Sequence, residues 1–139
     1  MFYLSHGWAD KPRVRVWQLR FEKKFPNIKL YNPFFENPYS EKTNNIDVPT
    51  MGLEQMKDVV ETDLEEISKS NRFVVVLPEK NYPLVGTSME MRHAYLEKVP
   101  IDVIGDGKLK NHIWIVYHLT NIFPNFGEYE EFVQKELKL

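Results

Sequence analysis

Glu90 is the side chain with the clearest potential for chemistry in this sequence. It lies in the run from Val85 to Ala94, where a helix is expected to begin directly after a strand and a loop. Thr87, Met91 and Ala94 fall on the same helical face as Glu90, so its carboxylate is expected to point toward a sheet and a crevice rather than open water. A carboxylate in that position is either a helix cap or a chemical reagent.

The capping alternative has direct local support. Thr87-Ser88-Met89-Glu90 has the form of a capping box, in which a glutamate folds back to the backbone N–H of the cap residue. On local sequence alone, the cap is the favoured interpretation of Glu90.

Asp63 presents the same choice one helix earlier. It stands four residues after Val59 and four before Ile67, so a regular helix places it among core residues, where an unpaired carboxylate is costly. The plain alternative is an aspartate bonded to nearby backbone or to a tyrosine, or facing an interface. Two such carboxylates near strand ends suit a retaining glycosyl transfer, because one attacks the anomeric carbon while the other protonates the leaving group.

The hydrophobic pattern predicts strands and helices that alternate along the chain. The continuous apolar run Phe73-Val74-Val75-Val76-Leu77 is typical of a central strand buried on both faces of a parallel sheet. Alternation implies right-handed crossovers, and hence a three-layer α/β sandwich around a mostly parallel sheet of five strands. The predicted strands are 2–5, 28–31, 73–77, 101–104 and 112–117, and the predicted helices are 12–25, 51–67, 87–98 and 128–137, with a long irregular connection at 32–50.

In such a sandwich, ligands bind beyond the carboxyl ends of the central strands. Three segments are expected to converge there: the turn from Ser5 to Trp8, the loop from Pro78 to Val85, and the helix start that carries Glu90. The topology therefore favours a reagent over a simple cap at this position.

Composition narrows the class of protein. The 139 residues are enough for one domain, 1–139, with its own core, and 42% hydrophobic with 27% charged residues is ordinary for a soluble protein. A net charge of -2 does not favour binding to nucleic acid polymers or to anionic membranes. Cysteine is absent, no stretch reaches membrane-spanning length, and the first residues do not form a signal peptide, so we expect a cytoplasmic protein.

Other motifs for chemistry have little support. The four histidines, His6, His93, His112 and His118, lack metal-ligand spacing, and Ser88 does not lie in a nucleophile elbow. Glycine-rich phosphate loops are also missing from the sequence. We therefore predict chemistry without a metal or a cofactor.

Three segments together resemble the nucleoside 2-deoxyribosyltransferases. They are Tyr3 to Trp8, Asp63 with the stretch up to Asn71, and Gly86 to Ala94, and their order and spacing match across most of the chain. The resemblance implies a flavodoxin-like sandwich, assembled as a homo-oligomer, from dimer to hexamer, with active sites shared between subunits. It also implies a deoxynucleoside and a free nucleobase as substrates.

The resemblance assigns roles to individual residues. Glu90 would attack C1′ of a 2′-deoxynucleoside, Tyr3 would orient it, and Asp63 would protonate the departing base. Trp8 would line the base pocket, and Asn121 would complete the sugar site of a neighbouring subunit, although a turn before Pro124 explains Asn121 equally well. Gly7, Gly86 and Ser88 complete the expected substrate-binding set.

The sequence also departs from this pattern. Leu84 stands where an acidic, sugar-binding residue is usual, Asn71 replaces a frequent aspartate, and Ser88 replaces a frequent glycine. A hydroxyl at a helix N-terminus suits a phosphate, with positive charge from Lys80, Arg92 and His93 nearby. Two alternatives follow: an N-glycosidase acting on deoxynucleosides or their 5′-monophosphates, and a non-catalytic nucleotide-binding protein.

Overall fold

A central sheet of five strands organises the protein, in a computed structural model that describes residues 1–39, 52–80 and 84–137. The strand order is β2-β1-β3-β4-β5, and every neighbouring pair is parallel. This order is that of the flavodoxin-like fold and confirms the predicted α/β sandwich. The strands are β1 (Phe2–Ser5), β2 (Leu30–Tyr31), β3 (Arg72–Val76), β4 (Ile101–Ile104) and β5 (Asn121–Phe123).

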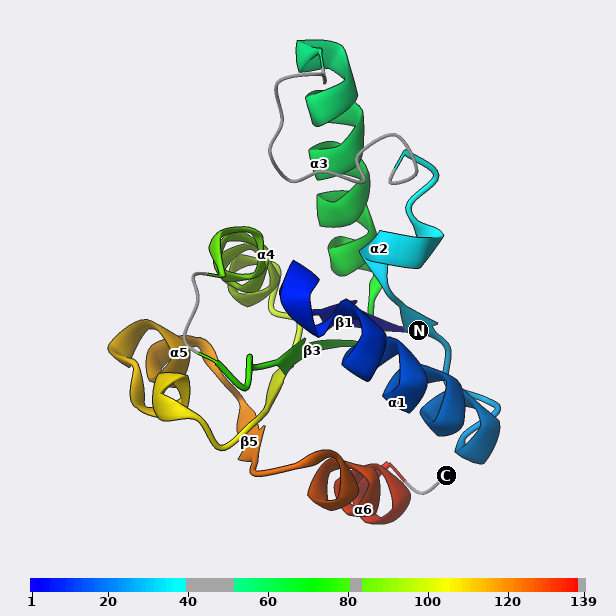
Figure 1. The fold of residues 1–139 in the computed structure, drawn as a ribbon, viewed down its shortest axis with the longest axis vertical. Helices are drawn as coiled ribbons and strands as arrows, with labels where there is room; N and C mark the ends of the chain where they lie inside the picture. Colours follow the sequence, from blue (N-terminus) through cyan, green and yellow to red (C-terminus); the bar gives the residue numbers. More distant parts are fainter. Residues whose placement is uncertain (40–51, 81–83, 138–139) are drawn as a thin grey trace.

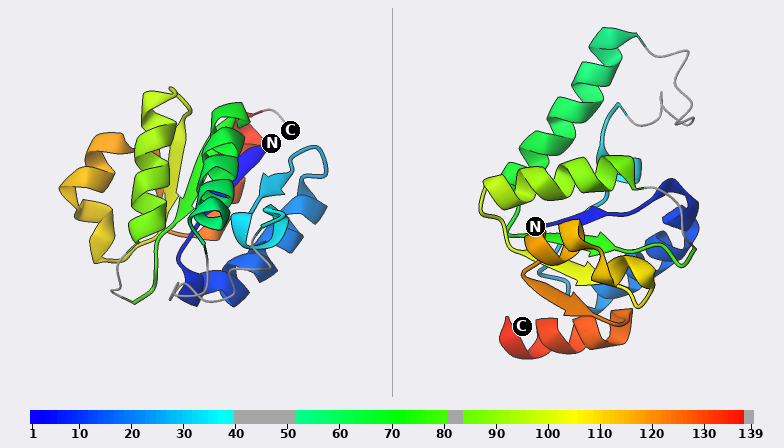
Figure 2. Two further views of the ribbon diagram at one scale, coloured as in Figure 1. Left: turned by 90° about the horizontal axis from the view of Figure 1, so that it is seen from above. Right: turned by 90° about the vertical axis from the view of Figure 1, so that its left-hand side faces the viewer.

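Helices cover both faces of this sheet (Figure 1). One face packs against α1 (Lys11–Lys24) and α6 (Phe126–Glu136). The other packs against α3 (Leu53–Lys69), α4 (Val85–Leu96) and α5 (Ile113–His118). Seen from above, α3, α4 and α5 lie side by side in that order, so α4 is flanked by a helix on each side (Figure 2).

Alternation along β1 decides which side chains reach α4. Successive residues of a strand point to opposite faces. Phe2 and Leu4 join the core beneath α1 and α6, whereas Tyr3 joins the core beneath α3 and α4. Ser5 follows Tyr3 at a spacing of two and therefore points to the same face. β1 thus presents two hydroxyl-bearing side chains to the helix that carries Glu90.

The prediction of a strand at 112–117 is wrong, because this segment forms α5. The His112 side chain caps the helix by accepting a hydrogen bond from the backbone N–H of Trp114. Ile113 and Trp114 are 76% and 64% exposed, so the apolar run is not a buried strand. A short apolar run does not by itself distinguish helix from strand. The fifth strand is β5, whose Asn121 pairs in register with Asp102 of β4.

The remaining boundaries agree with the sequence to within a few residues, apart from a short helix, α2 (Pro33–Glu36), inside the expected connection at 32–50. The rest of that connection from residue 40, and residues 81–83 of the loop before α4, lie outside the described residues. Two short 3-10 segments, Trp8–Asp10 and Lys108–Asn111, also lie within the described residues. None of the helices in the described ranges is long and apolar enough to span a membrane.

The apolar side chains of α3 are fully buried only near its carboxyl-terminal end. Ile67 is fully buried, whereas Val60 is 54% exposed and Leu53 is 80% exposed. A helix of 17 residues is about 25 Å long, whereas a four-residue strand spans about 13 Å. The amino-terminal half of α3 therefore extends beyond the sheet (Figure 1).

Candidate active site

Glu90 is held by two hydroxyl groups from β1. The Tyr3 hydroxyl donates a short hydrogen bond to Glu90 Oε2. The Ser5 hydroxyl donates to Glu90 Oε1 at 3.0 Å and also hydrogen-bonds to Thr87 Oγ1 at 3.0 Å. Both carboxylate oxygens are therefore fixed in direction, which is the geometry required of a positioned nucleophile or base.

The structure rules out the capping box proposed from local sequence. α4 begins at Val85 with Leu84 at its N-cap, and no side chain caps it. Thr87 consequently lies inside the first turn, and Glu90 lies one turn further on, beyond reach of the unpaired N–H groups at the helix start. The hydrogen bonds of Glu90 run to the sheet instead.

Burial dominates the electrostatics of Glu90. Burial, together with the negative charge of Asp63, raises the pKa of this carboxyl from 4.5 to about 7. The hydrogen bonds from Tyr3 and Ser5 act in the opposite direction because they stabilise the ionised form. The hydrogen-bond donors of Glu90 among the described residues are both neutral, so the carboxyl can exchange its proton near neutral pH.

Asp63 on α3 is the second carboxyl of the site. Burial raises its pKa from 3.8 to about 6, a hydrogen bond from Asn37 lowers it, and the charge of Glu66 raises it. Asn37 Nδ2 lies 2.7 Å from Asp63 Oδ1. The negative charge of Asp63 is one of the factors that raise the pKa of Glu90, and the common site predicted for the two residues stays a prediction.

Two stacked tyrosines form the sheet side of the site. The rings of Tyr3 and Tyr31 stack with centroids 5.5 Å apart. Burial raises the pKa of both hydroxyls, and the Glu90 and Asp63 charges add to this, so both tyrosines stay protonated donors. The Tyr31 hydroxyl is buried and has no hydrogen-bond partner among the described residues.

Sequence reasoning missed Ser5, Tyr31 and Asn37. The spacing of two between Tyr3 and Ser5 on a strand was a signal that could have found Ser5. Tyr31 and Asn37 carried no comparable signal, because their positions depend on β2 and on the segment that follows it.

Four expected substrate-binding residues lie at the carboxyl edge of the sheet. Gly7 is the N-cap of the 3-10 segment after β1, and Trp8 begins that segment with 52% of its surface exposed. Gly86 and Ser88 lie in the first turns of α4, where Ser88 Oγ donates to the Leu84 carbonyl at 2.6 Å. Their contacts with a substrate stay a prediction.

Asn121 is not brought to Glu90 within the chain. Its amide donates to Asp102 Oδ1 at 3.0 Å, and Asp102 also accepts from the Tyr129 hydroxyl of α6 at 3.0 Å. This network lies on the face of the sheet covered by α1 and α6, whereas Glu90 lies on the other face. The predicted role of Asn121 in a neighbouring subunit's site therefore competes with a structural role in its own chain.

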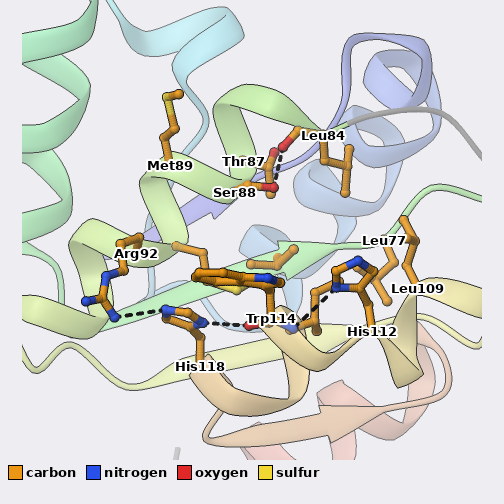
Figure 3. A pocket seen from close by; sticks show the side chains of 13 residues that line it. Leu77, Leu84, Thr87, Ser88, Met89, Arg92, Leu109, His112, Trp114 and His118 are labelled. Carbon is orange, nitrogen blue, oxygen red and sulfur yellow. Dashed lines mark hydrogen bonds between the residues drawn. The ribbon is translucent and has the colours of Figure 1, made fainter.

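A cavity of about 580 Å³ opens beside this site, between α4 and α5 (Figure 3). Leu84 and Thr87 line it from α4, and Trp114 lines it from α5. Arg92 also lines it and lies 3.3 Å from His118 Nε2, while His93 points elsewhere and hydrogen-bonds to Ser68 of α3. Of the three residues expected to supply positive charge, only Arg92 lines the cavity; Lys80 and His93 do not.

Comparison with known proteins supports the fold. No family model matches the sequence, and no curated protein matches it either. A solved structure of a 2-deoxyribosyltransferase from Bacillus psychrosaccharolyticus matches with a TM-score of 0.69 over 93% of this chain and 89% of that chain. The sequence identity is 16%, so this likeness establishes a shared fold.

Proposed function

We propose that the protein is a nucleoside 2-deoxyribosyltransferase, which moves 2-deoxyribose from one nucleobase to another. The observation that carries the proposal is the arrangement of Glu90, oriented by Tyr3 and Ser5 and coupled electrostatically to Asp63. The fold shared with a 2-deoxyribosyltransferase supports it independently.

In the first step, ionised Glu90 attacks C1′ of the deoxynucleoside. The C1′–O bond to Glu90 forms as the bond between C1′ and the base nitrogen breaks, and Asp63 gives its proton to the departing base. In the second step, a nitrogen of a new base attacks C1′ and displaces Glu90, while Asp63 takes back a proton. Two displacements at one carbon retain the anomeric configuration.

The two carboxyls can share one proton near neutral pH. Their pKa values of about 7 and about 6 lie close together, so one ionised and one protonated carboxyl can coexist there. Because the two groups interact, the apparent values belong to the pair. Glu90 has the higher pKa even with the hydrogen bonds from Tyr3 and Ser5, so the reactive form, with Glu90 ionised and Asp63 protonated, is the less populated of the two singly protonated forms.

Base exchange tests the proposal directly. Incubation of the protein with deoxyinosine and adenine should give deoxyadenosine and hypoxanthine, and both products can be measured by chromatography. Release of hypoxanthine without deoxyadenosine would assign water as the acceptor and make the protein an N-glycosidase. If neither deoxyadenosine nor free hypoxanthine forms, the protein lacks this catalytic activity, and a non-catalytic nucleotide-binding protein is the remaining alternative.

We also propose that the protein is a homo-oligomer with shared sites. Large apolar side chains are exposed on two helices beside the site, at Leu53 and Val60 of α3 and at Ile113, Trp114 and Val116 of α5. Exposed apolar surface of this kind is typical of protein–protein contacts. Sedimentation should give a mass above that of the 16.6 kDa chain, and a monomer at assay concentration would contradict this.

A further inference from the structure

The position of the cavity relative to the two carboxyls fixes which part of a substrate can enter it. Asp63 lies on α3, whereas the cavity is lined by residues of α4 and α5. Helices α3 and α5 flank α4 on opposite sides (Figure 2). If C1′ is at Glu90 and the base is at Asp63, the far end of the sugar points toward α5. This argument rests on the proposed function.

The distances along α4 fit a sugar with a substituent. Two hydrogen bonds of 3.0 Å lead from Glu90 Oε1 through Ser5 to Thr87 Oγ1, and Thr87 is a wall of the cavity. Thr87 lies about 4.5 Å and Leu84 about 9 Å further toward the helix start than Glu90. C5′ of a deoxyribose bound at Glu90 therefore comes to the mouth of the cavity, with the substituent beyond it.

The walls that this substituent would meet are apolar. They come from β3 and the segment after it, from α4, and from the elements that follow β4, and they are Val75, Leu77, Leu84, Met91, Leu109, Trp114 and Ile115. In Figure 3 the Trp114 ring lies flat along one side of the pocket. Such a surface favours alkyl or aryl groups, whose burial contributes about 0.8 kcal/mol per methylene.

Several polar side chains of the lining make hydrogen bonds within the protein. Ser88 donates to the Leu84 carbonyl, and His112 Nδ1 accepts from the backbone N–H of Trp114. His118 donates through Nδ1 to the Trp114 carbonyl and accepts from Arg92. Arg92 is the main charged residue of the lining that could bind a 5′-hydroxyl or a 5′-phosphate. The Arg92 guanidinium also lies over the ring of Tyr95, which is outside the lining.

We propose that this cavity binds an apolar substituent on C5′ of the deoxyribose, so that the preferred substrates are 2′-deoxynucleosides with a 5′-alkylthio or 5′-arylthio group. The volume of about 580 Å³ lies within the range of sites that hold small organic molecules. The chemistry at C1′ is unchanged, and the cavity sets specificity.

Calorimetric binding to the Glu90→Gln protein tests this without turnover. The ligands are 2′-deoxyadenosine, its 5′-deoxy-5′-butylthio derivative and its 5′-monophosphate. The butylthio compound should bind about 10-fold more tightly than 2′-deoxyadenosine or better. Equal or weaker binding of the butylthio compound would overturn the proposal, and so would tightest binding of the monophosphate.

Variants of the wall locate the effect. Leu84→Asp and Trp114→Ala should each remove most of the preference, because the first introduces a charge and the second removes an aromatic wall. Val16→Ala is the matched control, since Val16 is a 60% exposed residue of α1, on the other face of the sheet, and does not line the cavity. If the Leu84→Asp protein does not fold, the Trp114→Ala protein provides the test, because Trp114 is a partly exposed residue. A preference that survives Trp114→Ala would overturn the assignment.

The outcomes separate this inference from the proposed reaction. Base exchange by the unmodified protein without any 5′ preference would overturn the subsite alone. A clear 5′ preference in binding, with no base exchange or base release, would overturn the reaction alone.

Discussion

Asp102 and Glu90 carry carboxylates on opposite faces of the sheet, and the groups that surround the two carboxylates differ. Asp102 is fully buried and receives a bidentate ion pair from Arg72, at 2.5 and 2.7 Å, together with hydrogen bonds from Asn121 and Tyr129. Glu90 is partly buried and receives hydrogen bonds from Tyr3 and Ser5, which are both neutral.

The difference separates a structural carboxylate from a reactive one. A cation and two further donors satisfy Asp102, so its charge is neutralised where it lies. Glu90 has donors that fix its direction but no cation that fixes its charge, and burial raises its pKa to about 7. A carboxyl that is oriented and only weakly stabilised as an anion is suited to forming a bond with carbon.

The largest expected effect is on catalysis at Glu90. Glu90→Gln should lower the rate of base exchange by about 10⁴-fold or more, because an amide does not attack C1′. Steady-state base exchange measures this loss. Glu97→Gln is the control, since Glu97 is exposed at the end of the same helix. A Glu90→Gln protein that is both folded and active would remove Glu90 from the mechanism.

The next effect is on stability at Asp102. Asp102→Asn should lower the free energy of unfolding by about 3–5 kcal/mol, because it leaves the Arg72 guanidinium, only 14% exposed, without its counter-charge. Urea unfolding measures this. The folded fraction should keep its specific activity, since Asp102 lies on the face away from Glu90. A loss of activity without a loss of stability would contradict the assignment of Asp102 as the structural carboxylate.

A smaller effect is the pH dependence of stability that Glu90 causes. Its pKa rises from 4.5 to about 7 on folding, so the folded protein binds more protons than the unfolded chain between these values. The stabilisation is complete below about 4.5 and is lost as the pH rises through about 7. Relative to Glu90→Gln, the wild-type protein should lose on the order of 2–3 kcal/mol across this range.

Urea unfolding of both proteins at a series of pH values measures this difference. Asp63 adds a dependence of the same sign up to about pH 6, but both proteins contain it, so it cancels. A constant difference between the two proteins from acid to neutral pH would show that Glu90 is not held in a raised-pKa state.

The smallest effect concerns the orientation of Glu90 by Tyr3. Tyr3→Phe removes a donor that lowers the pKa of Glu90 and should reduce base exchange about 10–100-fold. The pH at which Glu90 ionises should also rise, which shifts the acidic limb of the pH–rate profile upward. Tyr31→Phe is a matched control for the pH shift, because the Tyr31 hydroxyl does not bond to Glu90. If the acidic limb of the pH–rate profile does not shift, Tyr3 has only a structural role.

Sequence patterns predicted most of the sheet because it depends on regular periodicity, whereas the pairing of Tyr3 with Glu90 was expected from the resemblance to the nucleoside 2-deoxyribosyltransferases. The buried run of β3 and the short apolar strand β1 are visible in the residue types. The segment from 112 to 117 was misassigned because its apolar residues lie on an exposed helix, where burial does not accompany hydrophobicity. Asn121 was expected at a neighbouring subunit's sugar site from the family resemblance, which stays a prediction, and within its own chain its partner is Asp102, nineteen positions away.

The contacts of Asn37 and Tyr31 could not be predicted for a related reason. Asn37 reaches Asp63 across 26 positions, from a segment without periodic structure. Tyr31 is the last residue of a two-residue strand, and its stacking on Tyr3 follows from the register between β1 and β2. Contacts of this kind depend on the packed fold rather than on local pattern.

The most direct test of Glu90 as the nucleophile is mass spectrometry of the protein quenched during turnover of a deoxynucleoside in the absence of a second base. The peptide containing Glu90 should gain the mass of one deoxyribosyl group, and Glu90→Gln should remove this adduct. A deoxyribosyl group on another peptide, or base exchange without any covalent adduct at Glu90, would contradict this role of Glu90.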